Sequence, residues 1–275
     1  MFNVSRKLLL CALIVLSLSC CAFADGQKIG LLGKSGMTEE EYANLANTAV
    51  KWTVNEKPSN ATLSFKFYDD LPSMLMGLNA GEIDSFIVTK ASGEYITNIN
   101  PSSYKISGVI RMNQANFAFG FMKGKGEILQ KKFNYALGEM RKDGTLEALR
   151  LKYFLNPGKD MGFESAEFEK FPDGETVKVA LTGDVPPLDF VAPDGKPGGF
   201  NTAVLAEIGR RLGYNIEMLV VSTASRIPAL ASGRADVVFW IQFFNDMEKQ
   251  PDMPSEIIVS EPYYSWDIFL KIGKK

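Results

Sequence analysis

The sequence of 275 residues contains no histidine and only three cysteines. All three, Cys11, Cys20 and Cys21, lie in an N-terminal segment that we expect to be removed, so the rest of the chain has neither residue type. This excludes a disulfide framework, a Cys or His metal site, and Ser-His-Asp or Cys-His catalysis. Any catalytic step would depend on carboxylates, lysine or tyrosine. We therefore expect no cofactor, no metal and no catalytic residue.

The removable segment is residues 1–24. Arg6 and Lys7 precede an apolar run at residues 8–18, and Ala22-Phe23-Ala24 follows it, which is the pattern of a secretory signal peptide. A membrane anchor is the alternative, but the run is about half of the roughly 20 residues that a spanning helix needs. A lipid anchor at Cys20 or Cys21 is a second alternative, for which the usual preceding residues are missing. We expect a periplasmic protein.

Charge gives no sign of a nucleic-acid partner. Of the 30 Lys and Arg residues, two lie in the signal segment, which leaves 28 against 32 Asp and Glu, a net charge of −4. A nucleic-acid-binding domain would carry a basic surplus.

Strand and helix patterns alternate along the chain and predict an α/β fold with mainly parallel sheets. Thr38 and Glu41 form a capping box that begins a helix, and a helix between Asp70 and Gly81 lies between two buried strands. Asn201 is predicted to open a later helix. Two stretches echo one another, LNAGEIDSFIV at residues 78–88 and LASGRADVVFW at residues 230–240, which suggests two lobes of similar construction, although any helix-Gly-strand unit has this form.

Several motifs occur in an order that resembles a known family. VALTGDVPPLDF is followed by DGK, GF, RRLG, IPAL, SGRAD and finally SEPYY. This series is similar to the bacterial extracellular solute-binding proteins, family 3, which deliver polar amino acids and related ligands to ABC importers. The resemblance implies a type II periplasmic binding protein fold, in which each of two lobes is a doubly wound, mainly parallel sheet with flanking helices.

The motif order also implies a circular permutation. The helix pair GEMRKDGTLEALRLKYF at residues 138–154 is similar to the family's ending, yet it precedes the family's beginning. The implied boundaries are lobe two at 25–112, the C-terminal part of lobe one at 113–155, a linker at 156–176, and the N-terminal part of lobe one at 177–275. We expect one continuous hinge crossing, near Asn113–Phe117, and a second formed only by chain ends near Lys28 and Lys271.

The resemblance places the family's amino-acid clamp on altered residues. The family's arginine falls at or near Glu248, or at Lys249 if the alignment shifts. Its aspartate falls at Lys90, and its stacking aromatic falls at Val185. An ordinary amino acid should therefore bind poorly, since an unpaired buried charge is costly.

The cleft is predicted from strand ends, helix starts and the family's geometry. Three candidates also have an interpretation that involves no ligand. Thr38 could simply cap a helix, Lys90 could be solvated, and Trp240 could lie in the core. Arg226 could face the cleft or solvent and is left out. The ligand-binding candidates are Ser35, Gly36, Thr38, Lys90, Asp184, Thr223, Trp240, Gln242, Phe243 and Glu248.

Three functions fit the sequence. The first is a non-enzymatic binding protein that captures a small polar solute, an amino acid or a related molecule, for an ABC permease. The second is a sensor or partner-binding protein on the same scaffold with a decayed amino-acid site. The third is an enzyme related to the cyclohexadienyl dehydratases, with Asp184 or Glu248 as its raised-pKa carboxyl. A monomer is expected, with a lobe-swapped dimer as the alternative.

Overall fold

The computed structural model describes residues 26–34, 36–48, 53–54, 57–58, 62–155, 157, 165–245 and 247–275. The expected signal peptide and Ser35 lie outside the described residues. The described part has a mixed α/β fold with one eleven-stranded sheet and one three-stranded sheet. No helix in these ranges is long and apolar enough to span a membrane.

The large sheet has the order β11-β7-β12-β6-β14-β5-β1-β4, and β2, β3 and β13 pair beside this path. The small sheet has the order β10-β9-β8. The strands are β1 (Lys28–Leu32), β2 (Thr53–Val54), β3 (Lys57–Pro58), β4 (Ser64–Tyr68), β5 (Ser85–Thr89), β6 (Tyr104–Met122), β7 (Thr176–Leu181), β8 (Asp184–Val185), β9 (Asp189–Val191), β10 (Pro197–Gly198), β11 (Asn215–Val220), β12 (Val237–Phe244), β13 (Ile257–Val259) and β14 (Tyr264–Lys274).

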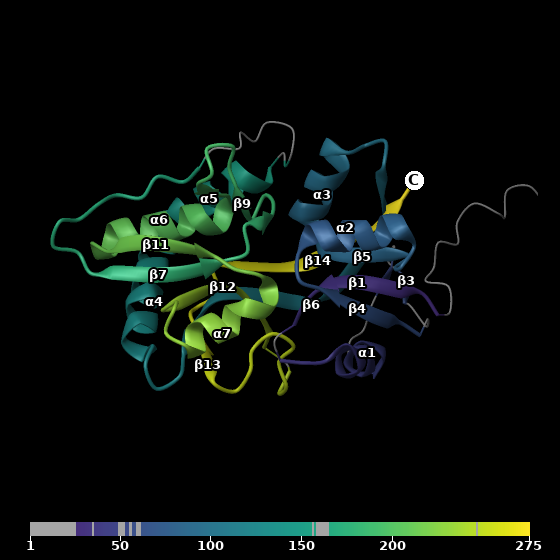
Figure 1. Ribbon diagram of the computed structural model, residues 1–275, viewed down its shortest axis with the longest axis horizontal. Coiled ribbons are helices and arrows are strands. Elements are labelled where there is room, and N and C mark those ends of the chain that lie inside the picture. The colour runs from purple at the N-terminus through teal and green to yellow at the C-terminus, as the bar shows by residue number, and fades with distance from the viewer. Residues whose placement is uncertain are drawn as a thin grey trace, which may run out of the picture.

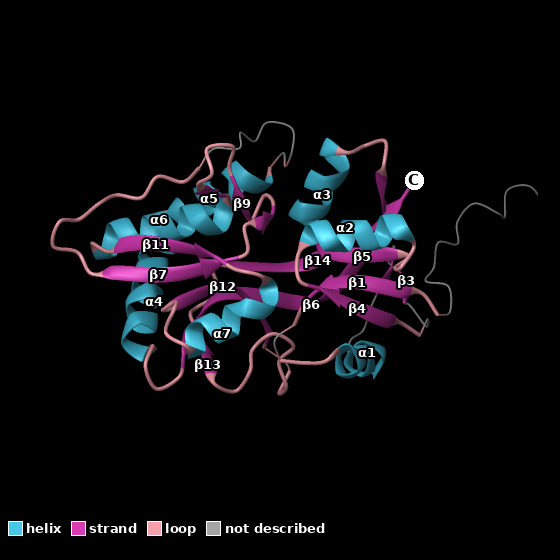
Figure 2. Ribbon diagram, in the orientation of Figure 1, coloured by secondary structure: helices cyan, strands magenta, loops and turns pink. Residues whose placement is uncertain are grey.

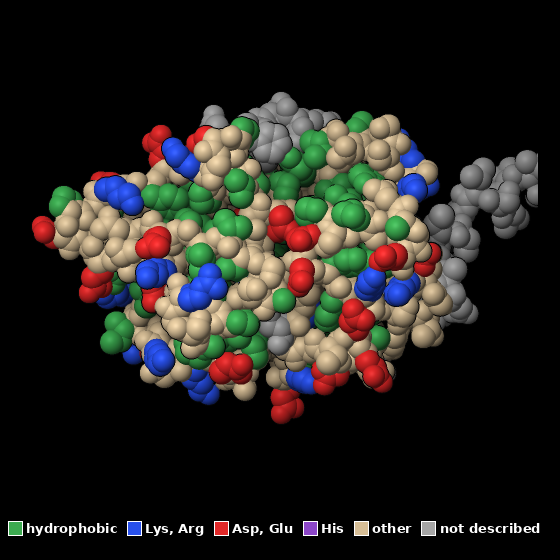
Figure 3. Space-filling model, in the orientation of Figure 1, with side chains coloured by type: hydrophobic (Ala, Val, Ile, Leu, Met, Phe, Trp, Pro, Cys, Tyr) green, Lys and Arg blue, Asp and Glu red, His purple; other side chains and the backbone are tan. Residues whose placement is uncertain are grey.

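Helices lie above and below the strands on both sides of the molecule (Figure 2). They are α1 (Glu39–Thr48), α2 (Leu71–Ala80), α3 (Lys90–Ile99), α4 (Glu127–Lys142), α5 (Thr145–Phe154), α6 (Phe200–Leu212) and α7 (Arg226–Ala231), with the 3-10 turn η1 (Thr223–Ser225) before α7. On the face shown in Figure 3, acidic and basic side chains are interspersed over both sides.

The large sheet is parallel at its two ends. At one end β11 and β12 flank β7, and at the other β4 and β5 flank β1, all in parallel register. We call the first group the C-terminal half-sheet (β7, β11, β12) and the second the N-terminal half-sheet (β1, β4, β5); they lie at opposite sides of Figure 1. The sheet is thus parallel as predicted at both ends, but its centre is antiparallel.

That antiparallel centre consists of two long strands that join the half-sheets. β6 pairs with β12, and β14 pairs with β6 from Tyr264 to Lys274 and with β5 from Phe269 to Ile272. The expectation of a single continuous crossing is therefore wrong. β14 continues through the centre into the N-terminal half-sheet, so two unbroken strands connect the halves. Lys271 lies within that strand, where its Nζ donates to Gln27 Oε1 at 2.6 Å.

Local sequence signals set several helix ends. Thr38 and Glu41 form the predicted capping box, with the Thr38 amide donating to Glu41 Oε2 at 2.9 Å and the Glu41 amide to Thr38 Oγ1 at 3.2 Å. Asp70 caps α2, and Gly81 ends it in the left-handed region with φ 76°. Both predictions are confirmed.

The prediction for Asn201 is wrong. α6 begins at Phe200 after Gly199, whose φ of 103° suits glycine. Asn201 is the second helical residue, fully buried, and its Nδ2 donates to Asp189 Oδ2 at 3.1 Å. Its polar side chain ties the helix to β9 instead of capping the helix.

Candidate functional site

A cavity lies between the two half-sheets. Its volume is about 70 Å³, and its walls come from the ends of β1 and β5 on one side and from β7, β8, η1, α7 and β12 on the other. The carboxyl ends of parallel strands face a ligand crevice in open α/β sheets. The lining residues are Leu31, Leu32, Gly33, Lys34, Tyr42, Ile87, Val88, Thr89, Ser92, Phe117, Thr182, Val185, Leu188, Asp189, Thr223, Arg226, Phe239, Trp240, Gln242, Asp252 and Phe269.

Contacts near the start of α2 join the two sides of the cavity. The Leu71 amide, at the N-terminus of α2, donates to Asp184 Oδ2 on β8 at 2.7 Å. Next to it, the Thr223 amide donates to the Asp69 carbonyl at 3.2 Å. Burial raises the pKa of Asp184, and its second oxygen, Oδ1, is buried with no hydrogen-bond partner among the residues described.

Further contacts lie near the start of α1. The Gly36 amide donates to the Pro251 carbonyl at 2.9 Å, and Lys249 Nζ forms an exposed ion pair with Glu41 Oε1 at 2.7 Å. A Cβ atom on Gly36 would lie 2.5 Å from the carbonyl oxygen of Gln250, so this approach needs glycine. Together the two groups of contacts hold the halves closed around the cavity.

An ion pair lies in the cavity wall of the C-terminal half-sheet. Arg226 is 3% exposed and donates from Nη2 to both carboxylate oxygens of Asp252, at 3.1 and 3.2 Å. Its Nη1 donates to the carbonyls of Phe239 and Trp240 at 3.0 Å each, and its Nε to the Thr223 carbonyl at 3.3 Å. These five bonds match the five N–H donors of a guanidinium group, so Arg226 is satisfied within its own wall.

A second cation enters the cavity from the opposite wall. Lys34 follows β1, and its Nζ donates to Gln242 Oε1 on β12 at 2.7 Å. Burial lowers the pKa of Lys34, while Asp252 acts in the opposite direction and Arg226 adds to the lowering. Lys34 is a lining residue whose charge has no carboxylate in direct contact among the described residues.

Asp189 is a buried carboxylate at the start of β9. Its Oδ1 accepts hydrogen bonds from Thr182 Oγ1 at 3.0 Å and from the Gly183 amide at 2.8 Å, and Asn201 binds Oδ2. Burial, assisted by the charge of Asp184, raises the pKa of Asp189 to about 6 even though these donors lower it. Its donors all come from its own half of the molecule.

Trp240 stands at an irregularity in β12. The register of β12 against β6 shifts between Val238 and Ile241, and Trp240 has φ 63°, unusual for a side chain of this size. This conformation turns its carbonyl to Arg226, while its ring stacks on Phe117 with centroids 3.9 Å apart. Trp240 therefore lines the cavity and also packs against the core, so both positions considered for it from the sequence apply.

The structure brings together part of the predicted site. Thr223, Trp240 and Gln242 line the cavity, as does Val185, the position of the family's stacking aromatic. Asp184 and Gly36 are outside the lining and form contacts between the halves.

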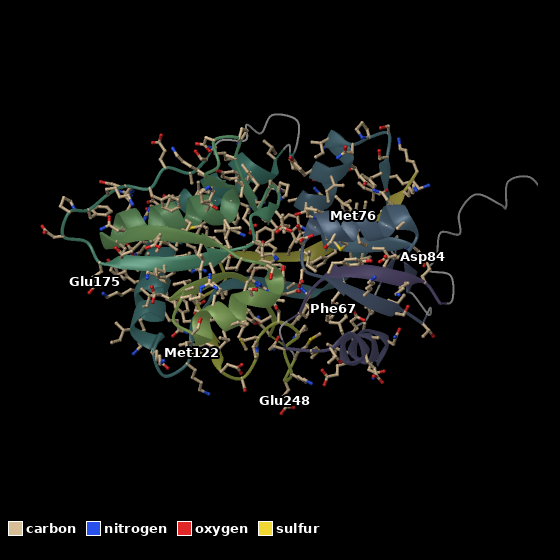
Figure 4. The ribbon with its side chains drawn as sticks, in the orientation of Figure 1. Phe67, Met76, Asp84, Met122, Glu175 and Glu248 are labelled. Atoms are coloured by element: carbon tan, nitrogen blue, oxygen red, sulfur yellow. The ribbon has the colours of Figure 1, made fainter. Side chains whose placement is uncertain are left out.

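The remaining described candidates are not among the residues that line the cavity. Thr38 is exposed and caps α1, Phe243 is half-buried in β12, and Lys90 pairs with Glu94 at 2.7 Å along α3. Glu248 is exposed on the loop after β12 and lies at the lower edge of Figure 4. Ser35 falls outside the described residues.

Sequence reasoning missed Lys34, Asp189, Asp252 and the role of Arg226. Lys34 had a signal, because a polar residue within two positions of the end of a buried parallel strand lies at the ligand edge of a sheet. Asp252 had none, since it lies in a loop and reaches Arg226 across 26 residues of sequence.

Comparisons with known proteins identify one segment of the chain. Residues 177–271 match the family model of the bacterial extracellular solute-binding proteins, family 3. A search of curated protein sequences finds no match.

Solved structures give similarities of low identity. The ligand-binding component of an ABC-type import system from Staphylococcus aureus, with zinc bound, has 11% identity and a TM-score of 0.42, covering 90% of this chain and 65% of that chain. The PBP AgaA from A. tumefacien R10, in complex with agropinic acid, has 11% identity and a TM-score of 0.40, covering 78% and 55%. The periplasmic aliphatic sulphonate binding protein SsuA from Escherichia coli has 10% identity and a TM-score of 0.35, covering 91% and 65%.

This chain thus spans 65% and 55% of the length of the first two structures. The resemblance carried by VALTGDVPPLDF through SEPYY is confirmed by the family match, which covers those motifs. Over residues 177–271 this chain is therefore similar to the bacterial extracellular solute-binding proteins, family 3.

Proposed function

We propose that this protein is a periplasmic solute-binding protein. It captures a small polar solute, an amino acid or a related molecule, between two lobes and delivers it to an ABC importer in the inner membrane. The two lobes are built around the N-terminal and C-terminal half-sheets, and the cavity between them is the ligand site. We propose that the protein acts as a monomer.

One observation carries this proposal. The cavity has walls from both half-sheets, and the bonds from Leu71 to Asp184 and from Gly36 to Pro251 close it from two directions. In the part of the chain that the structure describes, two strands, β6 and β14, run between the half-sheets through the centre of the large sheet. Hinge motion about a few connecting residues would open such a cavity and let a ligand enter.

The permuted order of the lobes is part of the proposal. The family match begins at residue 177, after more than half of the chain, and the helix pair α4 and α5 precedes it. The bond from Lys271 to Gln27 holds the end of β14 beside the beginning of β1. In the family's order the chain would be continuous at this point, and a cut here would give the order of this protein. Residues 156–176 would then join the ancestral ends.

An enzyme on this scaffold would need a carboxyl group with a raised pKa in the cavity. Asp189 has one, at about 6, but both of its oxygens accept hydrogen bonds from Thr182, Gly183 and Asn201. We therefore propose ligand binding without turnover. Mass spectrometry of the released ligand checks this, because a binding protein returns its ligand unchanged.

Thermal unfolding of the secreted protein against amino acids, dicarboxylates, polyamines, small organic acids and sugars tests the proposal. A ligand at about 100 times its Kd should add about 2.7 kcal/mol to the free energy of unfolding. This corresponds to roughly 5 to 10 °C in Tm for a protein of this size. A cooperative transition that no compound shifts would refute the proposal.

A further inference from the structure

Among the residues that the structure describes, the cavity lining holds one cation, Lys34, whose charge no carboxylate contacts. Lys34 Nζ has three N–H donors, and Gln242 Oε1, a neutral acceptor, is its partner among the described residues. Its position after β1 directs the ammonium group toward the opposite wall. Lys34 is partly buried, and a charge withdrawn from water is costly unless it is paired, so a ligand that supplies an anion to Lys34 gains the most from this site.

The hydrogen-bond donors of Arg226, the other cation in the cavity lining, are already used by the protein. The five donors of Arg226 bind Asp252 and three backbone carbonyls, so a ligand could reach them only by displacing a protein partner. Asp252 neutralises the Arg226 charge, and Asp189 is bonded within its own wall. The balance of contacts therefore leaves Lys34 as the group that selects the ligand's charge.

The size and lining of the cavity limit the rest of the ligand. A volume of about 70 Å³ has room for about five water molecules, or an organic molecule of similar size. More than half of the lining residues are apolar or aromatic, among them Leu31, Val88, Val185 and Trp240. Such walls accept a hydrocarbon portion and reject further charge.

We infer that the ligand is a small organic acid of about four to six non-hydrogen atoms. Its carboxylate binds the Lys34 ammonium and its apolar portion contacts the Trp240 wall. This assignment rests on the proposed function and narrows it, because an anion on Lys34 takes the place of a full amino-acid clamp. Short ion-assisted hydrogen bonds are the strongest that such a site can offer.

Pairs of compounds that differ only in charge test the assignment. Acetate, propionate, butyrate and lactate are compared with their amides, and alanine is added as a zwitterion of similar size. Binding to the secreted protein is measured by thermal unfolding and by the fluorescence of its tryptophans. The same titrations are repeated with Lys34→Gln, which keeps hydrogen-bond donors but loses the charge. Lys142→Gln, on the exposed side of α4, is the matched control.

At least one acid should raise Tm while its amide does not. Lys34→Gln should weaken binding of that acid by roughly 10- to 100-fold, the effect of one hydrogen bond to a charged group, while Lys142→Gln leaves it unchanged. Amides that bind as well as acids, alanine that binds best, or a Lys34→Gln protein with full affinity would overturn the assignment and leave the binding function standing. If neither these acids nor any compound of the wider panel shifts Tm, both the assignment of an acid ligand and the proposed binding function would be overturned.

Discussion

On the cavity wall of the C-terminal half-sheet, Arg226 and Asp252 neutralise one another and Asp189 is bonded by neighbours of its own half. On the opposite wall, Lys34 reaches Gln242 only by crossing the cavity. The bonds of Arg226, Asp252 and Asp189 are kept when the halves separate, whereas the bond from Lys34 depends on closure. This difference suggests that the C-terminal half-sheet provides a preorganised wall and the N-terminal half-sheet responds to the ligand.

The largest predicted effect comes from breaking the preorganised wall. Asp252→Asn would leave Arg226 charged and buried without its carboxylate, and removing one partner of a buried pair costs roughly 3 to 5 kcal/mol. Urea unfolding at neutral pH measures this loss. Glu139→Gln is the control, since it removes the partner of Lys142 from an exposed pair that should contribute nothing measurable. Equal stability of the two variants would show that the wall does not depend on this pair.

The second prediction concerns pH. Asp189 ionises near pH 6 in the folded protein but near 3.8 when unfolded, so the folded state holds the proton more tightly. The free energy of unfolding should therefore fall as the pH rises from about 4 to 6, by about 3 kcal/mol from this group alone. Asp189→Asn should lose that dependence and be more stable than the wild type above pH 6.

Asparagine is a suitable replacement at this position. Its amide oxygen can accept from Thr182 and Gly183, and Asn201 can turn its buried, unpartnered Oδ1 toward the new amide group. Unfolding curves of both proteins between pH 4 and 8 give the difference directly. Parallel curves for the wild type and Asp189→Asn would contradict the raised pKa of Asp189.

Much of the fold could be predicted from the sequence because its signals are local. The capping box at Thr38 and Glu41, the helix between Asp70 and Gly81, and the buried strands follow from patterns within a few residues. The long strand β6 was harder, since only its second part, FAFGFM, reads as a buried strand. The first part alternates polar and apolar residues, and its pairing with β14 depends on residues more than 150 positions away.

The candidate site could be predicted only where a residue's position on a strand determines its direction. Trp240 and Gln242 lie on β12 and line the cavity, whereas Glu248 lies in the following loop, whose path the alignment could not give. Lys90 follows β5, but it begins α3 and turns along that helix to Glu94. The ion pair of Arg226 and Asp252 forms only in the tertiary structure, so no periodic pattern in the sequence predicts it.

The smallest predicted effect tests closure itself. Asp184→Ala removes the acceptor for the Leu71 amide, a bond between the halves worth about 1 kcal/mol, so this amide should exchange with deuterium roughly five times faster. Asp184→Asn keeps an acceptor and removes a charge that burial disfavours, and its Leu71 amide should stay protected. Asp236→Ala is the matched control, because Asp236 accepts from the Lys178 amide at 2.8 Å within one half. If the Leu71 amide exchanges with deuterium at the same rate in Asp184→Ala and in Asp236→Ala, Asp184 contributes to stability but does not hold the two walls together.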